Sequence, residues 1–338
     1  MAKEKSSRVH KRKRGCLGGC LVRIVLLLGL LALLFVGACV LGFVRNDPQT
    51  GAPSLSFEVI GLEDGQLSDL SAIHLGDLSG MLEGIDADSW PYAVAKSGLT
   101  VKTLRAGEGE AVLVCSDGYT MLIGGGSSGT LLCGQLLLCG AGRLDAALML
   151  SCADEQAGGM AAAVSLLRPG YLLYPDSQTK SKAFNNVIAA AQKNGRTQLV
   201  APPQGMSFSL GRAKVTVIGP AYRHHTDERD DGLSVRIDYG ATSVLVMGGV
   251  TTAGEREIRS SGAPLRADVL ICAQGGGSEA TGADFVAAVS PRIALLTGAK
   301  PANPVIVRLQ KAGAKVYPAR DHGVMTVYSD GSDVRVVP

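Results

Sequence analysis

Short β-like runs alternate with helical stretches from residue 99 to the end of this 338-residue chain, and this alternation constrains the fold most. Gly-rich and Ser-Asp-Gly turns join the first runs, which favours tight antiparallel connections. Strands are predicted at 99–104, 110–115, 120–123, 144–150, 171–174, 213–218, 234–239, 243–247, 269–272, 293–296, 315–317 and 324–328. Helices are predicted at 130–138, 159–167 and 181–194. Strand clusters interrupted by helices imply an α/β domain in which helices cover the sheets.

An uncharged apolar stretch, residues 24–44, has the length that crosses a bilayer as a helix. Eight basic residues and a single acid, Glu4, precede it, so the positive-inside rule predicts a cytoplasmic N-terminus and an extracytoplasmic remainder. A cleaved secretory signal is the alternative, although its apolar core is usually shorter and ends at a small-residue cleavage site. The sequence Val36-Gly37-Ala38-Cys39 resembles a bacterial lipobox, in which Cys39 would become a lipidated N-terminus. The uncleaved anchor and the lipidated Cys39 both predict a domain tethered to a cell membrane.

Four segments follow from this division. They are a basic cytoplasmic leader (1–23), a transmembrane helix that serves as a signal anchor (24–44), a linker or small docking segment (45–98) and a large domain (99–338). The whole chain has 33 basic and 30 acidic residues, and 25 and 29 remain once the leader is set aside. A mildly acidic domain does not favour nucleic-acid binding through a large basic face. The expected partners are therefore the membrane, through 24–44, and an unknown protein or small ligand.

Two local patterns are typical of other sites. The run Gly124 to Gly129 satisfies Gly-x-Gly-x-x-Gly after a predicted strand, as in dinucleotide-binding turns, but two apparently antiparallel strands precede it. Nucleotide binding therefore stays an outside alternative. A second pattern combines two imidazoles and four carboxylates, which is typical of metal sites, but it lies in a polar connection where solvated charge is the ordinary explanation. Its residues are His224, His225, Asp227, Glu228, Asp230 and Asp231.

The stretch after the predicted strand 144–150 resembles a known signature. Residues 151–159 read Ser-Cys-Ala-Asp-Glu-Gln-Ala-Gly-Gly, which is similar to the metallo-β-lactamase signature His-x-His-x-Asp-His with every ligand replaced. The replaced positions are Ser151, Ala153, Glu155 and Gln156.

Other stretches resemble landmarks of the same fold family, and of the C-terminal domain of ComEC-type DNA-uptake competence proteins in particular. Residues 104–111 are similar to the opening strand and the turn Asp-Val-Gly-Gln-Gly-Asp of these proteins. Residues 121–126 resemble their Leu-Ile-Asp-Gly-Gly, with Gly124 in place of the acid. The landmarks keep their order and spacing over 99–338.

Two further landmarks lie in the second half of the domain. Residues 227–249 resemble a stretch that ends in Thr-Gly-Asp, with Gly249 at the metal-bridging Asp. Residues 272–278 match a His-His-Gly-Ser turn, with Gly275 and Gly276 in place of both His. The resemblance implies an αββα four-layer sandwich of the metallo-β-lactamase type, preceded by the transmembrane helix.

The replaced residues decide what chemistry remains. Zinc is usually held by four imidazole, thiolate or carboxylate donors at about 2.0–2.3 Å, which Ser, Ala and Gly side chains do not supply. We therefore expect no catalytic residue, no metal site and no cofactor. Zinc or manganese would bind only if neighbouring side chains rebuilt a site. The candidate donors for a rebuilt site are Cys152, Asp154, Glu155 and Cys272.

Runs of three glycines at 124–126 and 275–277 predict a wide, backbone-lined cavity at the former site. The sequence as a whole predicts a single-pass bacterial membrane protein whose extracytoplasmic domain is a pseudoenzyme, acting in binding or scaffolding. The enzyme alternative is a ComEC-like hydrolase, of the nuclease or phosphodiesterase class, with a rearranged site.

Overall fold

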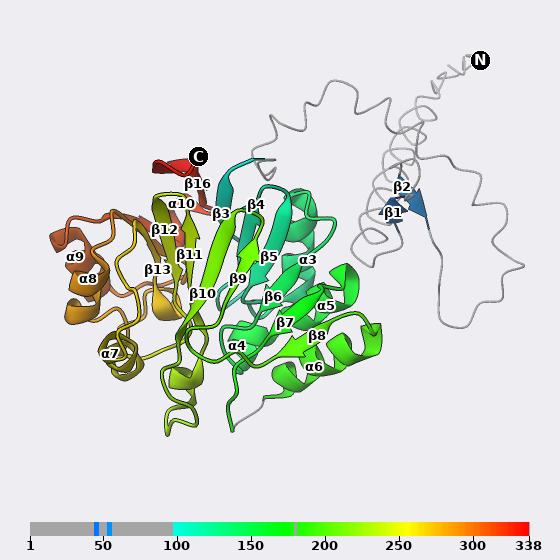
Figure 1. The fold of residues 1–338 in the computed structure, drawn as a ribbon, viewed down its shortest axis with the longest axis horizontal. Coiled ribbons are helices and arrows are strands. Elements are labelled where there is room, and N and C mark those ends of the chain that lie inside the picture. Colours follow the sequence, from blue (N-terminus) through cyan, green and yellow to red (C-terminus); the bar gives the residue numbers. More distant parts are fainter. Residues whose placement is uncertain (1–43, 47–52, 56–96, 179–180, 338) are drawn as a thin grey trace, which may run out of the picture. The chain divides into compact units, whose positions relative to one another are not determined.

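The computed structural model describes residues 44–46, 53–55, 97–178 and 181–337 (Figure 1). The chain divides into two units, Met1–Met81 and Leu82–Pro338. In the first unit, β1 (Val44–Asn46) and β2 (Pro53–Leu55) form an antiparallel pair. In the second unit, two large sheets contain all the other described strands.

The first of these sheets has eight strands in the order β17-β16-β3-β4-β5-β6-β7-β8. The strands from β17 to β5 in that order are antiparallel, whereas β5, β6, β7 and β8 run parallel. The bounds are β3 (Leu99–Thr103), β4 (Val112–Ser116), β5 (Tyr119–Ile123), β6 (Ala146–Leu148), β7 (Tyr171–Leu173), β8 (Gln198–Val200), β16 (Thr326–Ser329) and β17 (Val334–Val337).

The second sheet has seven strands in the order β15-β14-β13-β12-β11-β10-β9. Here β9 to β12 are antiparallel and β12 to β15 are parallel. The bounds are β9 (Ser207–Leu210), β10 (Ala213–Gly219), β11 (Ser234–Tyr239), β12 (Thr242–Val246), β13 (Val269–Ile271), β14 (Ile293–Leu296) and β15 (Lys315–Pro318).

Helices cover the outer face of each sheet, and Figure 1 shows them on opposite sides of the strands. The helices on the eight-stranded sheet are α3 (Gly129–Leu138), α4 (Asp154–Ala157), α5 (Met160–Leu167) and α6 (Lys182–Asn194). Those on the seven-stranded sheet are α7 (Thr252–Ser260), α8 (Ala283–Val289) and α9 (Asn303–Lys311). The short helical segments η1 (Glu228–Asp231), η2 (Ala273–Gly275) and α10 (Ala319–His322) lie in connections.

The core consists of three apolar layers, because both faces of each sheet are buried. In β4, Val112 and Val114 pack between the two sheets, whereas Leu113 packs under the helices of its own sheet. In β12, Val246 likewise faces the other sheet and Leu245 faces α7, α8 and α9. Strands buried on both faces are continuously apolar rather than alternating. The domain is therefore a four-layer αββα sandwich, and its mixed α/β sheets confirm the predicted class.

The predicted elements differ from the structure mainly where the chain is polar or short. The predicted helices begin and end within one residue of α3, α5 and α6. The edge strands β8, β9 and β17 and the helices α4, α7, α8, α9 and α10 were not predicted. Helix α7 has the sequence Thr-Ala-Gly-Glu-Arg-Glu-Ile-Arg-Ser, in which only Gly254, Glu255 and Ile258 are buried. Such a polar segment shows little of the apolar periodicity from which a helix is predicted.

The membrane helix predicted at 24–44 lies outside the described residues, apart from Val44. This last residue is the first of β1. None of the helices in the described part of the chain is long and apolar enough to cross a membrane. The division into leader, anchor, linker and domain stays a prediction.

Candidate functional site

The carboxyl ends of strands from both sheets meet at one edge of the sandwich, where the positions predicted to be replaced ligands lie. The backbone N–H of Leu233 donates to the carbonyl of Leu150 at 2.9 Å, which joins the loops before β11 and after β6. A Cβ atom on Gly249 would lie 3.8 Å from the Cβ of Ser151. The structure thus brings together two positions that are almost a hundred residues apart in the sequence.

A buried carboxyl group, Glu110, connects more of these positions. Its side chain is 1% exposed, and its Oε1 accepts hydrogen bonds from the backbone N–H of Gly275 at 2.9 Å and from Thr297 Oγ1 at 3.1 Å. Its own backbone N–H donates to Gln156 Oε1 at 3.1 Å. Glu110 therefore ties the loop before β4 to the loops after β13 and β14, across the two sheets.

The sequence analysis did not single out Glu110. It ends the stretch 104–111, and the turn that this stretch resembles also ends in an acid. This correspondence was the signal in the sequence that could have identified Glu110. The residues that form hydrogen bonds with Glu110 lie 46 to 187 positions away along the chain.

Burial raises the pKa of Glu110 to about 8, although the hydrogen bonds from Gly275 and Thr297 act in the opposite direction. Its second oxygen, Oε2, has no hydrogen-bond partner among the described residues. A carboxyl group with this pKa is mostly protonated at neutral pH. It is therefore a neutral structural group rather than a ready anionic ligand.

The glycines at this edge leave no room for side chains. A Cβ on Gly124, where φ is +70°, would lie 2.3 Å from the carbonyl oxygen of Glu110. A Cβ on Gly275, where φ is +61°, would lie 2.4 Å from the N of Gly298, and one on Gly276 would lie 2.6 Å from Leu296 Cδ2. The predicted wide cavity is wrong at these positions, because neighbouring backbone and side chains occupy the space.

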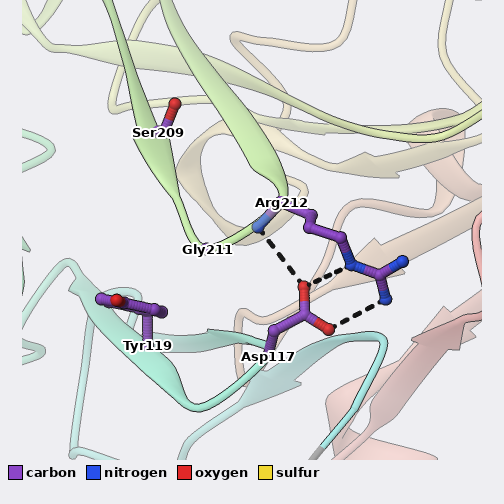
Figure 2. Close-up of a pocket in the computed structure, with 5 residues that line it drawn as sticks. All are labelled: Asp117, Tyr119, Ser209, Gly211 and Arg212. Carbon is purple, nitrogen blue, oxygen red and sulfur yellow. Dashed lines mark hydrogen bonds and ion pairs between the residues drawn. The ribbon is translucent and has the colours of Figure 1, made fainter.

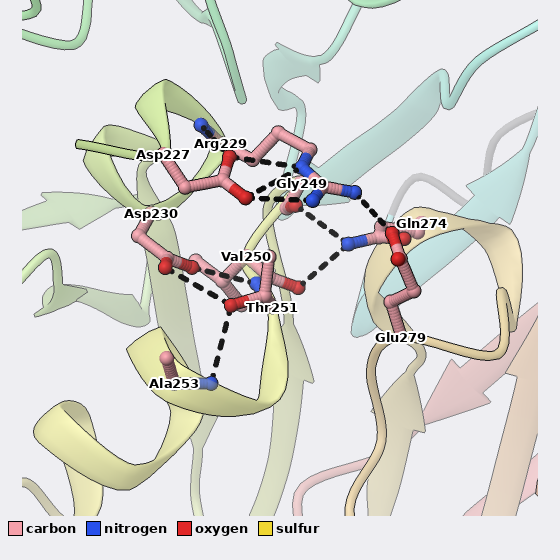
Figure 3. Close-up of polar contacts among 9 residues, drawn as sticks. All are labelled: Asp227, Arg229, Asp230, Gly249, Val250, Thr251, Ala253, Gln274 and Glu279. Carbon is pink, nitrogen blue, oxygen red and sulfur yellow. Dashed lines mark hydrogen bonds and ion pairs between the residues drawn. The ribbon is translucent and has the colours of Figure 1, made fainter. Parts of the chain in front are cut away.

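The remaining position is Gly249, and polar contacts bind its carbonyl group and the neighbouring loops, as Figure 3 shows. Gln274 Nε2 donates to the carbonyl oxygens of Gly249 at 3.1 Å and Val250 at 3.2 Å. Arg229 forms ion pairs with Asp227 and Glu279, so it links η1 to the loop after η2. These surface pairs contribute little to stability individually. Together with Gln274 they hold the three loops in one arrangement.

The candidate donors for a rebuilt metal site do not converge. Cys152 is buried under the helices of the eight-stranded sheet, and Cys272 is buried under those of the other sheet. Asp154 Oδ1 accepts the backbone N–H of Ala183 at 3.0 Å, and this hydrogen bond lowers the pKa of Asp154. Glu155 is exposed. Asp154 therefore caps the start of α6, and no pair among these four side chains forms a site.

The cluster after His224 is also divided between separate partners. His225 Nδ1 lies 2.8 Å from Asp231 Oδ1, and its Nε2 lies 2.7 Å from Glu257 Oε2. Asp230 accepts hydrogen bonds from the N–H and hydroxyl of Thr251 at 2.7 and 2.9 Å. Throughout the described part of the chain, no group of three or more His, Cys, Asp or Glu side chains is placed to hold a metal ion. The cluster stabilises the loop between β10 and β11.

The glycine-rich run after β5 does not present a phosphate-binding turn. The backbone N–H groups of Gly124 to Ser128 all donate to backbone carbonyl oxygens, at 2.7 to 3.1 Å. Dinucleotide-binding turns instead direct such groups at the pyrophosphate. The strand before the run, β5, is antiparallel to β4. Both observations disfavour the nucleotide-binding alternative.

An open hollow lies at the opposite ends of the strands (Figure 2). Its lining residues are Asp117, Tyr119, Ser209, Gly211 and Arg212. The guanidinium of Arg212 donates to both oxygens of Asp117 at 2.9 Å and lowers the pKa of Asp117. The two charged side chains that line the hollow are therefore paired with each other.

No protein-family model matches this sequence, and no curated protein matches it. Among solved structures, the chain is similar to the metallo-β-lactamase fold protein YhfI from Bacillus subtilis, with 15% identity over 64% of this chain and 95% of that one and a TM-score of 0.42. It is also similar to CmlA, a diiron β-hydroxylase from Streptomyces venezuelae, with 13% identity over 77% of this chain and 60% of that one and a TM-score of 0.43.

A third similar structure is Zn²⁺-bound PqqB from Methylobacterium extorquens, with 11% identity over 62% of this chain and 83% of that one and a TM-score of 0.38. Zinc and diiron centres need several imidazole or carboxylate donors around each ion. The strand ends of this chain offer Ser151, Gln156, glycines and the protonated, hydrogen-bonded Glu110. These residues do not fit such a metal centre.

Proposed function

We propose that this protein is a membrane-anchored, extracytoplasmic pseudoenzyme of metallo-β-lactamase-like fold, which acts by binding or scaffolding. One observation carries the proposal: at the strand ends, where ligands would converge, a Cβ on Gly124 or Gly275 would overlap backbone atoms. Restoring a ligand-bearing side chain at either position would require the backbone to move. The frame is thus adapted to the absence of these ligands.

The hydrogen bonds at the same edge support the proposal. Gln156 and Gln274 use their side-chain amides to bind the backbone of neighbouring loops. An amide that bridges loops stabilises a closed arrangement, whereas a hydrolytic metal site needs an open coordination position for water. The edge therefore has the properties of a structural junction.

One observation favours the second candidate, a ComEC-like hydrolase of the nuclease or phosphodiesterase class with a rearranged site. The Oε2 atom of Glu110 is buried, and within the described residues it has no hydrogen-bond partner. An unsatisfied buried oxygen is costly and often marks a functional group. Glu110 is thus the residue on which residual activity would depend.

Hydrolysis assays on the full chain in detergent distinguish the two candidates. The substrates are bis(p-nitrophenyl) phosphate and single-stranded DNA, with zinc or manganese added, and the matched control is Glu110→Gln. We expect equal background rates for the native chain and the variant. A metal-dependent rate that Glu110→Gln abolishes would instead establish the hydrolase.

The membrane anchor is tested separately. After expression in a bacterium, the full chain should stay in the membrane pellet on alkaline carbonate extraction, and protease added outside spheroplasts should digest the domain from residue 97 onward. Release of the chain by carbonate, or complete protection from the protease, would refute the anchor or its orientation. Neither result depends on catalytic activity.

A further inference from the structure

The outer face of α3 and α5 carries no charge. Neither helix contains a charged residue, although both lie on the surface of the domain. The two helices touch near their N-termini, where a Cβ on Gly129 would lie 2.8 Å from the Cβ of Ala162. Two adjacent surface helices thus form one continuous uncharged face, which we call the α3–α5 face.

Large aliphatic side chains project from this face. Leu131, Leu137 and Leu138 of α3 are 53%, 48% and 47% exposed. Within the described residues, these three account for nearly half of the exposed large hydrophobic side chains. Exposed leucines gathered on one helix, rather than scattered, are typical of an interaction surface. By contrast α6, which covers the same sheet, has exposed Lys182 and Lys193.

Two arginines and a tyrosine border the face at the C-terminal ends of the two helices. Arg143 follows α3 and Arg168 ends α5, and both are exposed. Tyr171 is 49% exposed, and its N–H donates to the carbonyl of Asp145 at 3.3 Å. The side chain of Asp145 pairs with Arg143 at 2.9 Å, so these residues lie around one point. An apolar face edged by arginine and tyrosine matches the acyl and headgroup levels of a bilayer.

We propose that the α3–α5 face docks onto the surface of an anionic lipid bilayer, with its leucines at the acyl boundary and Arg168 on lipid phosphates. The charges favour an anionic surface, because neither helix carries an acid and the acid at the edge, Asp145, is already paired with Arg143. The inference rests on the proposed membrane anchor for its setting. The proposed anchor at 24–44 is on the same chain, so a bilayer is the surface that this face would meet.

The test places a fluorescent reporter on the face in the full chain, reconstituted into vesicles with brominated acyl chains. The single tryptophan, Trp90, is replaced by phenylalanine, and Leu138→Trp is the reporter. The matched control is Gln192→Trp, on the exposed face of α6. In vesicles of phosphatidylglycerol and phosphatidylcholine, we expect the Leu138→Trp emission to fall by about half or more relative to non-brominated vesicles, and the control emission to stay nearly unchanged.

Further variants assign the contact to this face. Adding Leu131→Glu should return the quenching of the reporter to the level of the control. Arg168→Asn should reduce the difference between anionic and purely zwitterionic vesicles. Asn is chosen because Arg168 has a positive φ. A blue-shifted but unquenched reporter would overturn the proposal, since protein would then cover the face. Equal quenching of reporter and control would also overturn it.

Failure of the docking and failure of the proposed anchor give different results. Co-sedimentation of the full chain with vesicles tests the anchor, whatever the reporter shows. A chain that sediments with vesicles and has an unquenched reporter would refute the docking alone. A chain that stays in the supernatant would refute the anchor, and the docking would fail with it.

Discussion

At the scale of single residues, Glu110 determines how the two halves of the strand-end edge are joined. Its Oε1 accepts hydrogen bonds from Gly275 and Thr297, and its N–H reaches Gln156. A buried carboxyl that accepts hydrogen bonds on one oxygen only is most stable in its neutral form. The free energy of unfolding therefore depends on pH through the charge state of Glu110.

We predict that Glu110→Gln flattens the dependence of unfolding free energy on pH. The pKa of Glu110 is raised from 4.5 to about 8, so the folded state holds a proton that the unfolded state has lost between these values. Stability due to this group is present below the lower value and falls as pH rises, by at most about 1.4 kcal/mol per pH unit. Urea unfolding of the native chain and the variant from pH 5 to 9 measures it. Parallel profiles would contradict the prediction.

Glu255 supplies the contrast for that experiment. Burial raises the pKa of Glu255 to about 7, but both of its oxygens accept backbone N–H groups, from Thr281 at 2.5 Å and Gly282 at 2.8 Å. The amide nitrogen in Glu255→Gln would face one of these donors. Glu255→Gln should therefore destabilise the protein by about 1–3 kcal/mol at low pH, and by less as pH rises toward the folded-state pKa of about 7.

His225 has the opposite electrostatic setting, because it lies between two carboxylates. Burial alone would lower the pKa of His225, but hydrogen bonds to Asp231 and Glu257 outweigh it and raise the pKa above 6.5. Its stabilisation is then fully present below pH 6.5 and is lost as pH rises through the folded-state pKa. We predict that His225→Asn costs about 1 kcal/mol more at pH 6 than at pH 9, since solvent screens the part-exposed Glu257.

Urea unfolding at both pH values measures this difference. The control is His224→Asn, because His224 is exposed and its positive φ is one that Asn tolerates. The control should change stability by the same amount at both pH values. A cost of His225→Asn that does not vary with pH would show that the imidazole is not charged in the folded state.

At the scale of elements, the turns that follow the parallel strands determine the character of the edge. The turn after β5 begins at Gly124, which has a left-handed backbone conformation, and a Cβ there would lie 2.3 Å from the carbonyl oxygen of Glu110. In the turn after β13, a Cβ on Gly275 would lie 2.4 Å from the N of Gly298. The turn after β12 is different. At Gly249 a Cβ would meet only Ser151, at ordinary contact distance.

This difference predicts unequal costs for the same substitution. Gly124→Ala should destabilise the domain by about 2–4 kcal/mol, because a Cβ there is strained by φ and overlaps backbone. Gly249→Ala should change stability by only about 0.5 kcal/mol. Thermal and urea unfolding of the two variants measure both. Equal costs would mean that the edge is looser than the Cβ distances indicate.

Strongly periodic or apolar segments could be predicted from the sequence, and polar ones could not. Strands β11 and β14 have the predicted bounds, since β11 alternates apolar and polar residues and β14 is an aliphatic run. The edge strand β9, Ser207–Leu210, buries only Leu210 and gives no such signal. The replaced positions Ser151 and Gly249 lie together in the structure, but the closed packing around Gly124 and Gly275 depends on Cβ distances that no sequence pattern contains.

At the scale of the whole molecule, the two sheets share one apolar layer and are joined at one edge by polar contacts. The layer between the sheets is mainly apolar, and it also contains a buried hydrogen bond at 2.7 Å between the hydroxyls of Thr242 and Ser329, one from each sheet. Hydrophobic burial of this extent is the dominant stabilising contribution in domains of this size. This burial would keep the fold stable under the proposed loss of the metal ligands.

Metal content tests the central claim most directly. The full chain is expressed in zinc- and manganese-supplemented medium, purified in detergent without chelator, and measured by elemental mass spectrometry beside Glu110→Gln. The replaced positions and the closed packing at Gly124 and Gly275 predict metal well below one equivalent per chain, with no difference between the two proteins. Stoichiometric metal in the native chain that is lost in Glu110→Gln would contradict the account and establish a rebuilt metal site.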